Sequence, residues 1–263
     1  MQDIDPIHAV RDAALSKVPL ATLAFWIAKI IATTLGETGG DALSMSANLG
    51  YAISSLIFLA FFLVTVSAQI LAKRYRAALY WMVVVATTTV GTTTSDYLDR
   101  TLGLGYVKSS IILLCSVIAV LFVWKLSSGA IAVDQIKSRK DEGFYWLTIL
   151  ISNTLGTALG DFAATTTGLG FEGGTLLFAS LIALVALAHF FTRLPAAILF
   201  WTAYVLTRPL GATLGDTLTK APTEGGLGLS RVMSSLALVT VMILAVAWAA
   251  RARERSGEAE SIR

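Results

Sequence analysis

The sequence carries very little charge for its length, which excludes most classes of soluble protein. Only 14% of its 263 residues are charged, whereas a soluble domain usually carries about 25%. Apolar residues make up 56% of the chain and the mean hydropathy is +0.73. Runs of about 20 apolar residues are long enough to cross a ~30 Å hydrocarbon core as helices. The composition therefore predicts an all-α, polytopic membrane protein.

Cysteine and histidine are also scarce. The single cysteine, Cys115, lies in an apolar run and can form no disulfide within the chain. His8 and His189 are expected to be interface residues, which argues against zinc or copper ligands. Motifs of zinc proteases, serine hydrolases and phosphate-binding loops are absent, so the sequence predicts no enzyme. A catalytic pair of aspartates inside the membrane is the remaining enzymatic alternative.

Apolar segments of helical length recur eight times along the chain. The odd-numbered ones carry a repeated Trp, Gly and Asp pattern and are called A helices; the even-numbered ones are plain aliphatic spans and are called B helices. The sequence thus predicts eight transmembrane helices. Their expected limits are 20–43, 50–72, 77–98, 106–126, 144–165, 172–192, 196–217 and 229–250.

Lys and Arg residues indicate how these helices are oriented. They are denser after B helices than after A helices, and the positive-inside rule places the denser loops in the cytoplasm. Both termini are then cytoplasmic. The same reading of the basic residues excludes nucleic acid as a partner, despite the net charge of +3. Basic residues after B helices include Lys73, Arg74, Arg76, Lys125, Lys137, Arg139, Lys140, Arg193, Arg251, Arg253 and Arg255; those after A helices are Arg100, Lys108, Lys220 and Arg231.

One sequence pattern occurs four times along the chain. Each A helix has a Trp after an aromatic residue, a Gly ten residues later, a second small residue four further on, and then an Asp. The Trp residues are expected at the cytoplasmic interface, which places every Asp in the outer part of the bilayer. The four copies are Trp26, Gly36, Gly40 and Asp41; Trp81, Gly91, Ser95 and Asp96; Trp146, Gly156, Gly160 and Asp161; and Trp201, Gly211, Gly215 and Asp216.

These repeats resemble a bacterial integral membrane protein family defined as a repeat of unknown function, with two transmembrane helices and one Trp in each of four tandem copies. The resemblance rests on the Trp residues and on the Gly-x-x-x-small-Asp cores, and it implies topology but no activity. Trp spacings of 55, 65 and 55 residues indicate two halves of two repeats. All repeats then run parallel, with pseudo-four-fold (2+2) symmetry.

The expected domain limits follow from the repeats. Residues 1–19 lack the pattern of a secretory signal and are predicted to be a cytoplasmic lead. A cytoplasmic linker and a cytoplasmic tail complete the prediction. The repeats cover residues 20–72, 77–126, 144–192 and 196–250, the linker 127–143 and the tail 251–263.

The small residues of the pattern favour close packing of the A helices, with B helices outside towards lipid. The acids invite two interpretations. Asp41, Asp96, Asp161 and Asp216 either cap the outer helix ends or share a cation or proton, because four carboxylates cannot all stay ionised close together. Glu37 adds a fifth acid in the first repeat only. Hydroxyl and amide side chains accompany them: Thr33, Thr34, Thr88, Thr89, Thr92, Thr93, Asn153, Thr154, Thr157 and Thr213.

The fourth repeat departs from the others, with Arg208 and Pro209 in place of Thr33 and Thr34. An intramembrane Arg needs a partner, and Glu37 is a candidate on the same helix face. The pair is interpreted either as structural or as a gate. Lys29 lies only three residues past Trp26, and we expect its side chain to reach towards the cytoplasm.

The sequence therefore predicts an inner-membrane transporter of a small hard cation. Protonation of the same acids could supply the coupling for this transport. Oxygen ligands suit Na⁺, Mg²⁺, Ca²⁺ or Mn²⁺. The site would be Asp41, Asp96, Asp161, Asp216 and Glu37, with Arg208 as gate. The alternative is a membrane sensor or scaffold protein in which the acids are structural. The expected partners are the lipid bilayer and a cation or proton, and a homo-oligomer is compatible with these features.

Overall fold

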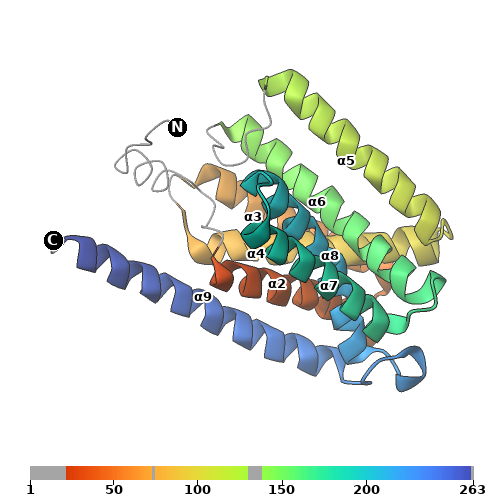
Figure 1. Cartoon of the computed structure of the whole chain (residues 1–263). Helices are drawn as coiled ribbons and strands as arrows, with labels where there is room; N and C mark the ends of the chain where they lie inside the picture. Colours follow the sequence, from red (N-terminus) through yellow and green to blue (C-terminus); the bar gives the residue numbers. More distant parts are fainter. Residues whose placement is uncertain (1–21, 73–74, 130–137, 262–263) are drawn as a thin grey trace.

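The structure, a computed structural model, describes residues 22–72, 75–129 and 138–261, and these are helical with no strand among them. The all-α prediction is confirmed for this part of the chain. The predicted lead at 1–19 and the basic residues Lys73, Arg74 and Lys137 lie outside the described residues. Figure 1 shows the A helices α2 (Leu23–Asp41), α4 (Ala77–Asp96), α6 (Arg139–Asp161) and α8 (Ala196–Thr219), and the B helices α3 (Gly50–Leu71), α5 (Tyr106–Ser128), α7 (Gly170–Phe191) and α9 (Arg231–Ser261).

Polar and apolar residues are distributed as in a membrane protein. The B helices expose large apolar side chains, such as Leu56, Ile111 and Phe190, while the A helices bury threonines and acids. Among the described residues, five helical stretches are long and apolar enough to cross a membrane. They are Gly50–Leu71, Tyr106–Ser128, Arg139–Thr166, Gly170–Phe191 and Arg231–Trp248. The other three long helices, α2, α4 and α8, carry more Gly and Thr because their neighbours cover them.

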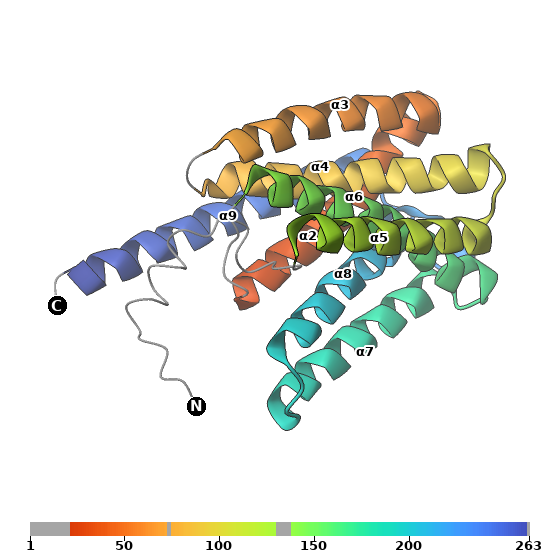
Figure 2. The same ribbon diagram turned by 90° about the horizontal axis from the view of Figure 1, so that it is seen from above.

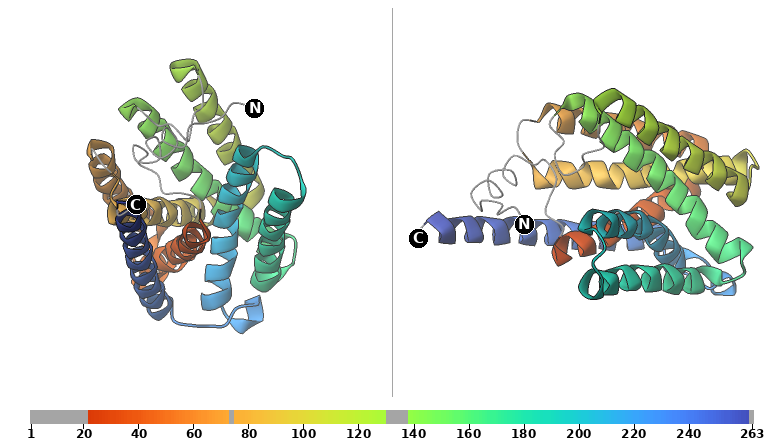
Figure 3. Two further views of the ribbon diagram at one scale, coloured as in Figure 1. Left: turned by 60° about the vertical axis from the view of Figure 1, so that its left-hand side comes forward. Right: turned by 45° about the horizontal axis from the view of Figure 1, so that its top comes forward.

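The four A helices form a closed ring. Helix α2 packs on α4, α4 on α6, α6 on α8, and α8 returns to α2. Each B helix packs on the A helix that follows it: α3 on α4, α5 on α6, and α7 on α8, as Figure 2 shows for the first and last of these pairs. Helix α9 packs on α2 and so covers the remaining A helix (Figure 3). The A helices are thereby shielded by the B helices, as the small-residue pattern predicted.

Helix starts and the links between A and B helices follow from local chemistry. The hydroxyls of Thr22 and Ser138 accept hydrogen bonds from backbone N–H groups in the first turns of α2 and α6. At the other end of three A helices, a five-residue π-helical turn begins directly after the Asp: Ala42–Ser46, Tyr97–Thr101 and Phe162–Thr166. The next helix then starts at or beside a glycine of positive φ, which only glycine adopts readily: Gly50, Gly105 and Gly170.

Candidate functional site

The A helices touch most closely where a glycine of one repeat meets a side chain of the next. The glycine ten residues after each Trp faces the residue seven after the Trp of the following repeat. A Cβ added to Gly91, for example, would lie 3.0 Å from the Asn153 carbonyl carbon. The four contacts are Gly36 with Thr88, Gly91 with Asn153, Gly156 with Arg208, and Gly211 with Thr33. The predicted packing role of these glycines is confirmed.

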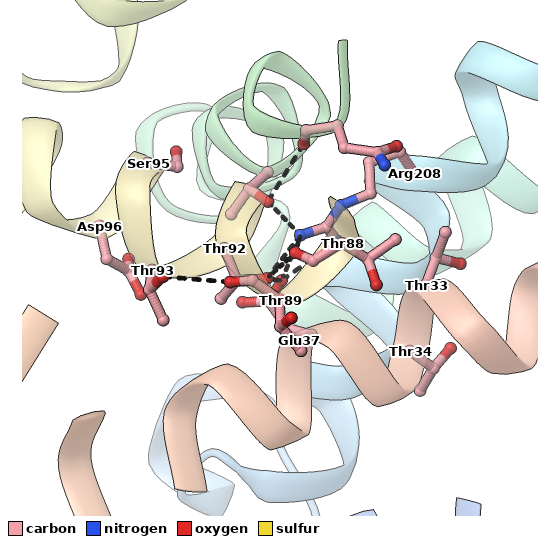
Figure 4. Close-up of polar contacts among 12 residues, drawn as sticks. Thr33, Thr34, Glu37, Thr88, Thr89, Thr92, Thr93, Ser95, Asp96 and Arg208 are labelled. Carbon is pink, nitrogen blue, oxygen red and sulfur yellow. Dashed lines mark hydrogen bonds and ion pairs between the residues drawn. The ribbon is translucent and has the colours of Figure 1, made fainter. Parts of the chain in front are cut away.

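Arg208 occupies this position in the fourth repeat, and its side chain bonds to the other three A helices. It is 1% exposed. Both terminal nitrogens donate to Glu37 Oε2 of α2 at 3.3 Å. The guanidinium also donates to the Thr88 carbonyl oxygen and the Thr92 hydroxyl of α4, and to the Thr157 hydroxyl of α6. Arg208 thus fills the ring interior at this level, with Glu37 as the predicted partner (Figure 4).

Glu37 is held on several sides. The Thr92 hydroxyl donates to its Oε2 at 3.0 Å, the same oxygen that accepts from Arg208. The backbone of Gly215 in α8 approaches the Glu37 Cβ and Cγ atoms. Because Gly215 has no side chain, it leaves room for the Glu37 side chain. An ion pair buried this deeply costs several kcal/mol of desolvation per ion and is retained only with good geometry and further hydrogen bonds. Thr92 and the other donors around Arg208 supply them.

The four aspartates lie at the end of the ring opposite the Trp residues, and two basic side chains bridge them in pairs. Lys220 Nζ lies 2.8 Å from Asp41 Oδ2 and 3.1 Å from Asp216 Oδ1. Arg100 Nε lies 2.9 Å from Asp96 Oδ1, and Arg100 Nη2 lies 3.4 Å from Asp161 Oδ2. Each base thus joins the Asp of its own repeat to the Asp of the next one. The four acids converge as two pairs.

Arg100 and Lys220 are the residues that the sequence interpretation missed, because it treated them only as loop charges. A signal was available, since each lies four residues after an Asp, one helical turn away. Repeats one and three have Met45 and Thr165 at this position. The bases therefore follow the two-fold relation between halves and not the four-fold one.

Most of the predicted hydroxyl lining is buried but turned to its own helix. Thr34, Thr89, Thr93 and Thr154 donate to carbonyl oxygens three or four residues earlier. Such bonds use the hydroxyl hydrogen of each side chain, so that the oxygen lone pairs are what remains for a ligand. Two further threonines, Thr33 and Thr88, donate across the ring to the Thr207 and Ala32 carbonyls. Among the described threonines, Thr92 and Thr157 bond to Arg208 through their hydroxyls, and Thr88 bonds to it through its backbone carbonyl.

Three acids lie close enough to share one cation. One carboxylate oxygen each from Glu37, Asp41 and Asp96 lies within 4.8 Å of the others, and all three residues are buried. Oxygen atoms on opposite sides of one Ca²⁺ are about 5 Å apart. The donor set is oxygen only, as hard cations prefer. Asp41 Oδ1 and Asp216 Oδ2 are buried without a hydrogen-bond partner among the described residues.

The prediction for Lys29 is wrong. Its side chain does not extend to the surface, as a side chain reaching towards the cytoplasm would, but is fully buried in the ring, with Nζ 4.2 Å from the centre of the Tyr204 ring. The reason is that Lys29 shares the inward face of α2 with Phe25, Ala32 and Thr33, which are also buried. From this face its four-carbon stem meets the neighbouring A helices.

Comparison with known proteins identifies the repeat. A family model described as a Repeat of Unknown Function (DUF347) matches residues 24–75, 79–130, 144–194 and 199–255. The chain therefore belongs to the DUF347 repeat family, in agreement with the resemblance inferred from its Trp and Asp pattern. No curated protein and no solved structure matches the chain significantly.

Proposed function

We propose that this DUF347 repeat protein is a transporter of a small hard cation in a bacterial inner membrane. The observation that carries the proposal is the charge of the ring interior. Five acids that are at most 3% exposed, Glu37 and the four repeat aspartates, form ion pairs with the buried bases Arg208 and Lys220 and with Arg100, whose side chain is 30% exposed. A fourth base, Arg231, lies at the edge of this group of charges. Its side chain is a quarter exposed, and its Nε atom is 3.5 Å from Asp41 Oδ2. The five acids share these four bases, so that this group of ion-paired side chains carries a net negative charge.

An excess of buried carboxylates has two physical remedies, a bound cation or bound protons. Glu37, Asp41 and Asp96 form the place for the cation, because their oxygens are mutually within 4.8 Å. Na⁺, Mg²⁺, Ca²⁺ and Mn²⁺ are the cations that an all-oxygen set suits. Protons that bind the same acids would compete with the cation, which is a simple basis for coupling.

Arg208 gives the proposal a gate. It bonds to Glu37 Oε2, so a cation that takes this carboxylate weakens the hold on Arg208. The guanidinium fills the ring at this level, which argues for alternating access and against an open pore. The residues on each side differ: aromatic rings at the Trp end and acids at the Asp end. Access would therefore alternate about the Arg208 level.

The proposal includes all eight long helices as spans, with both termini in the cytoplasm. Helices α2, α4 and α8 are less apolar than spans exposed to lipid, but the ring and the B helices cover them. The positive-inside rule, applied to the basic residues after the B helices, supports a cytoplasmic location for the Trp end. The acids then open towards the outer side of the membrane.

A structural role for the acids is the second candidate, and a specific observation favours it. Each of the four aspartates makes an ion pair, and Lys220 and Arg100 tie neighbouring repeats together. In a sensor or scaffold protein the same contacts would only hold the ring closed. The two candidates differ in whether a cation is bound.

Thermal unfolding in detergent with added cations separates them. The transporter account predicts that at least one of Na⁺, Mg²⁺, Ca²⁺ and Mn²⁺ raises the unfolding midpoint of the wild type, because a ligand of the folded state stabilises it. Asp41→Asn removes the effect, while Glu172→Gln, an exposed acid at the start of α7, retains it. If a cation raises the unfolding midpoint of the wild type no more than it raises the midpoints of both variants, the effect is one of salt in general. That result supports the scaffold.

A further inference from the structure

A second buried polar cluster lies at the Trp end of the ring, away from the acids. Each A helix contributes to it: Lys29 from α2, Tyr80 from α4, Tyr145 and Trp146 from α6, and Tyr204 from α8. These side chains are all at most 4% exposed. The proposed cation site does not use any of them.

Lys29 is the exceptional member, because its amine has no hydrogen-bond acceptor among the described residues. Its Nζ atom lies over the face of the Tyr204 ring, 4.2 Å from the ring centre. Arg208 is a second buried cation of the ring and offers Lys29 no counter-charge. Buried charges are normally paired, since an isolated ammonium in an apolar interior is very costly. Neither a ring face nor another cation provides that pairing.

The groups beside Lys29 are donors in need of acceptors. The hydroxyls of Tyr80 and Tyr204 and the indole N–H of Trp146 are buried without a hydrogen-bond partner among the described residues. Their side chains belong to one cluster, because the Tyr80 and Trp146 ring centres are 5.7 Å apart. The Tyr145 hydroxyl is the nearby acceptor for the Tyr80 and Tyr204 hydroxyls, but their geometry falls short of a hydrogen bond. Glu142 is buried at this end of the ring and lies near Tyr145.

We propose that Lys29, Tyr80, Trp146 and Tyr204 form a binding site for a small monovalent anion at the Trp end of the ring. The ammonium supplies the counter-charge, and two hydroxyls and one indole N–H supply neutral donors. A halide ion accepts from all of them without a preferred direction. Formate offers the same charge with two acceptor oxygens. The cluster lacks the second cation that a divalent anion would need, because Arg208 is already paired with Glu37.

The site is independent of the proposed transport of cations, and its test needs no transport. The unfolding midpoint of the purified protein is measured in detergent at constant Na⁺, with gluconate replaced stepwise by chloride, bromide or formate. Gluconate is too large for the cluster and serves as the reference. We expect the midpoint to rise saturably with at least one small anion, and the arms show whether a halide or a small carboxylate is preferred.

Variants decide whether Lys29 is responsible. Lys29→Met is expected to abolish the anion dependence, while Lys125→Met, at an exposed lysine of α5, retains it. If Lys29→Met does not fold, Tyr204→Phe and Tyr80→Phe, which keep the ring, each weaken anion affinity severalfold or more. The proposal is overturned if none of the three anions stabilises the wild type beyond gluconate, or if the stabilisation is unchanged in the Lys29 and tyrosine variants.

Discussion

At the scale of single residues, Arg208 distinguishes this protein from a symmetric four-fold assembly. It takes the position that Thr33, Thr88 and Asn153 hold in the other repeats, and it contacts all three remaining A helices. Its pairing with Glu37 could be predicted because Glu37 is the acid without a counterpart in the other repeats and lies on the same helix face. Its contacts with two threonine hydroxyls could not, since they depend on how far the helices are rotated about their axes.

Removal of one partner of this pair should destabilise the protein more than removal of both. Arg208→Met leaves Glu37 buried without its counter-charge, for which the cost is about 3–5 kcal/mol. The double variant Arg208→Met with Glu37→Gln removes the uncompensated charge and should recover a large part of that loss. Unfolding midpoints in detergent give the comparison. Purely additive losses in the double variant would show that the two side chains do not interact.

At the scale of helices, the repeated pattern predicted the right elements and the right packing residues. The A helices meet through the glycines that the Trp spacing singled out. What the pattern could not give is the partner of each B helix. Packing α3 on α4, and α9 back on α2, depends on the direction in which each link leaves the ring. The π-helical turns after Asp41, Asp96 and Asp161 were also not predicted, because no residue type marks them.

Two glycines of α2, three residues apart, test the close packing. A Cβ at Gly36 would collide with the Thr88 side chain and backbone, whereas a Cβ at Gly39 would only touch Thr89 at 3.9 Å. Gly36→Ala should therefore lower stability by about 1–3 kcal/mol through overpacking. Gly39→Ala should be neutral or stabilising by up to ~1 kcal/mol, because Ala is the better helix former. Thermal unfolding of both variants in detergent measures the difference; equal effects would contradict the ring contact.

At the scale of the whole molecule, the ring has three polar levels along its axis. Lys29 and the tyrosines lie at the Trp end, Arg208 and Glu37 in the middle, and the aspartates with Arg100 and Lys220 at the far end. The sequence predicted the aspartates from the fixed Trp-to-Asp spacing, and Glu37 as an extra acid of the first repeat. The sequence interpretation missed the two bridging bases, Arg100 and Lys220. It also expected the Lys29 side chain to extend out of the ring towards the cytoplasm, because a charge in the sequence does not show in which direction its side chain points.

This arrangement is more than a stable bundle requires. Well-packed apolar residues often stabilise as much as a buried ion pair, so a helix ring has no need of five buried acids. A function for them explains their presence better than stability does. The proposed cation transport gives each feature a role: the acids as ligands, Arg208 as the group that closes the axis, and the two different ends of the ring as the sites of access from each side.

The most direct measurement is cation flux into liposomes that contain the purified protein, for Na⁺, Mg²⁺, Ca²⁺ and Mn²⁺ with and without a pH gradient. The account predicts flux of at least one cation above that of empty liposomes, a loss of tenfold or more in Asp41→Asn and in Asp161→Asn, and retention in Glu172→Gln. Wild-type flux equal to that of empty liposomes for every cation, or flux unchanged in both aspartate variants, would contradict it.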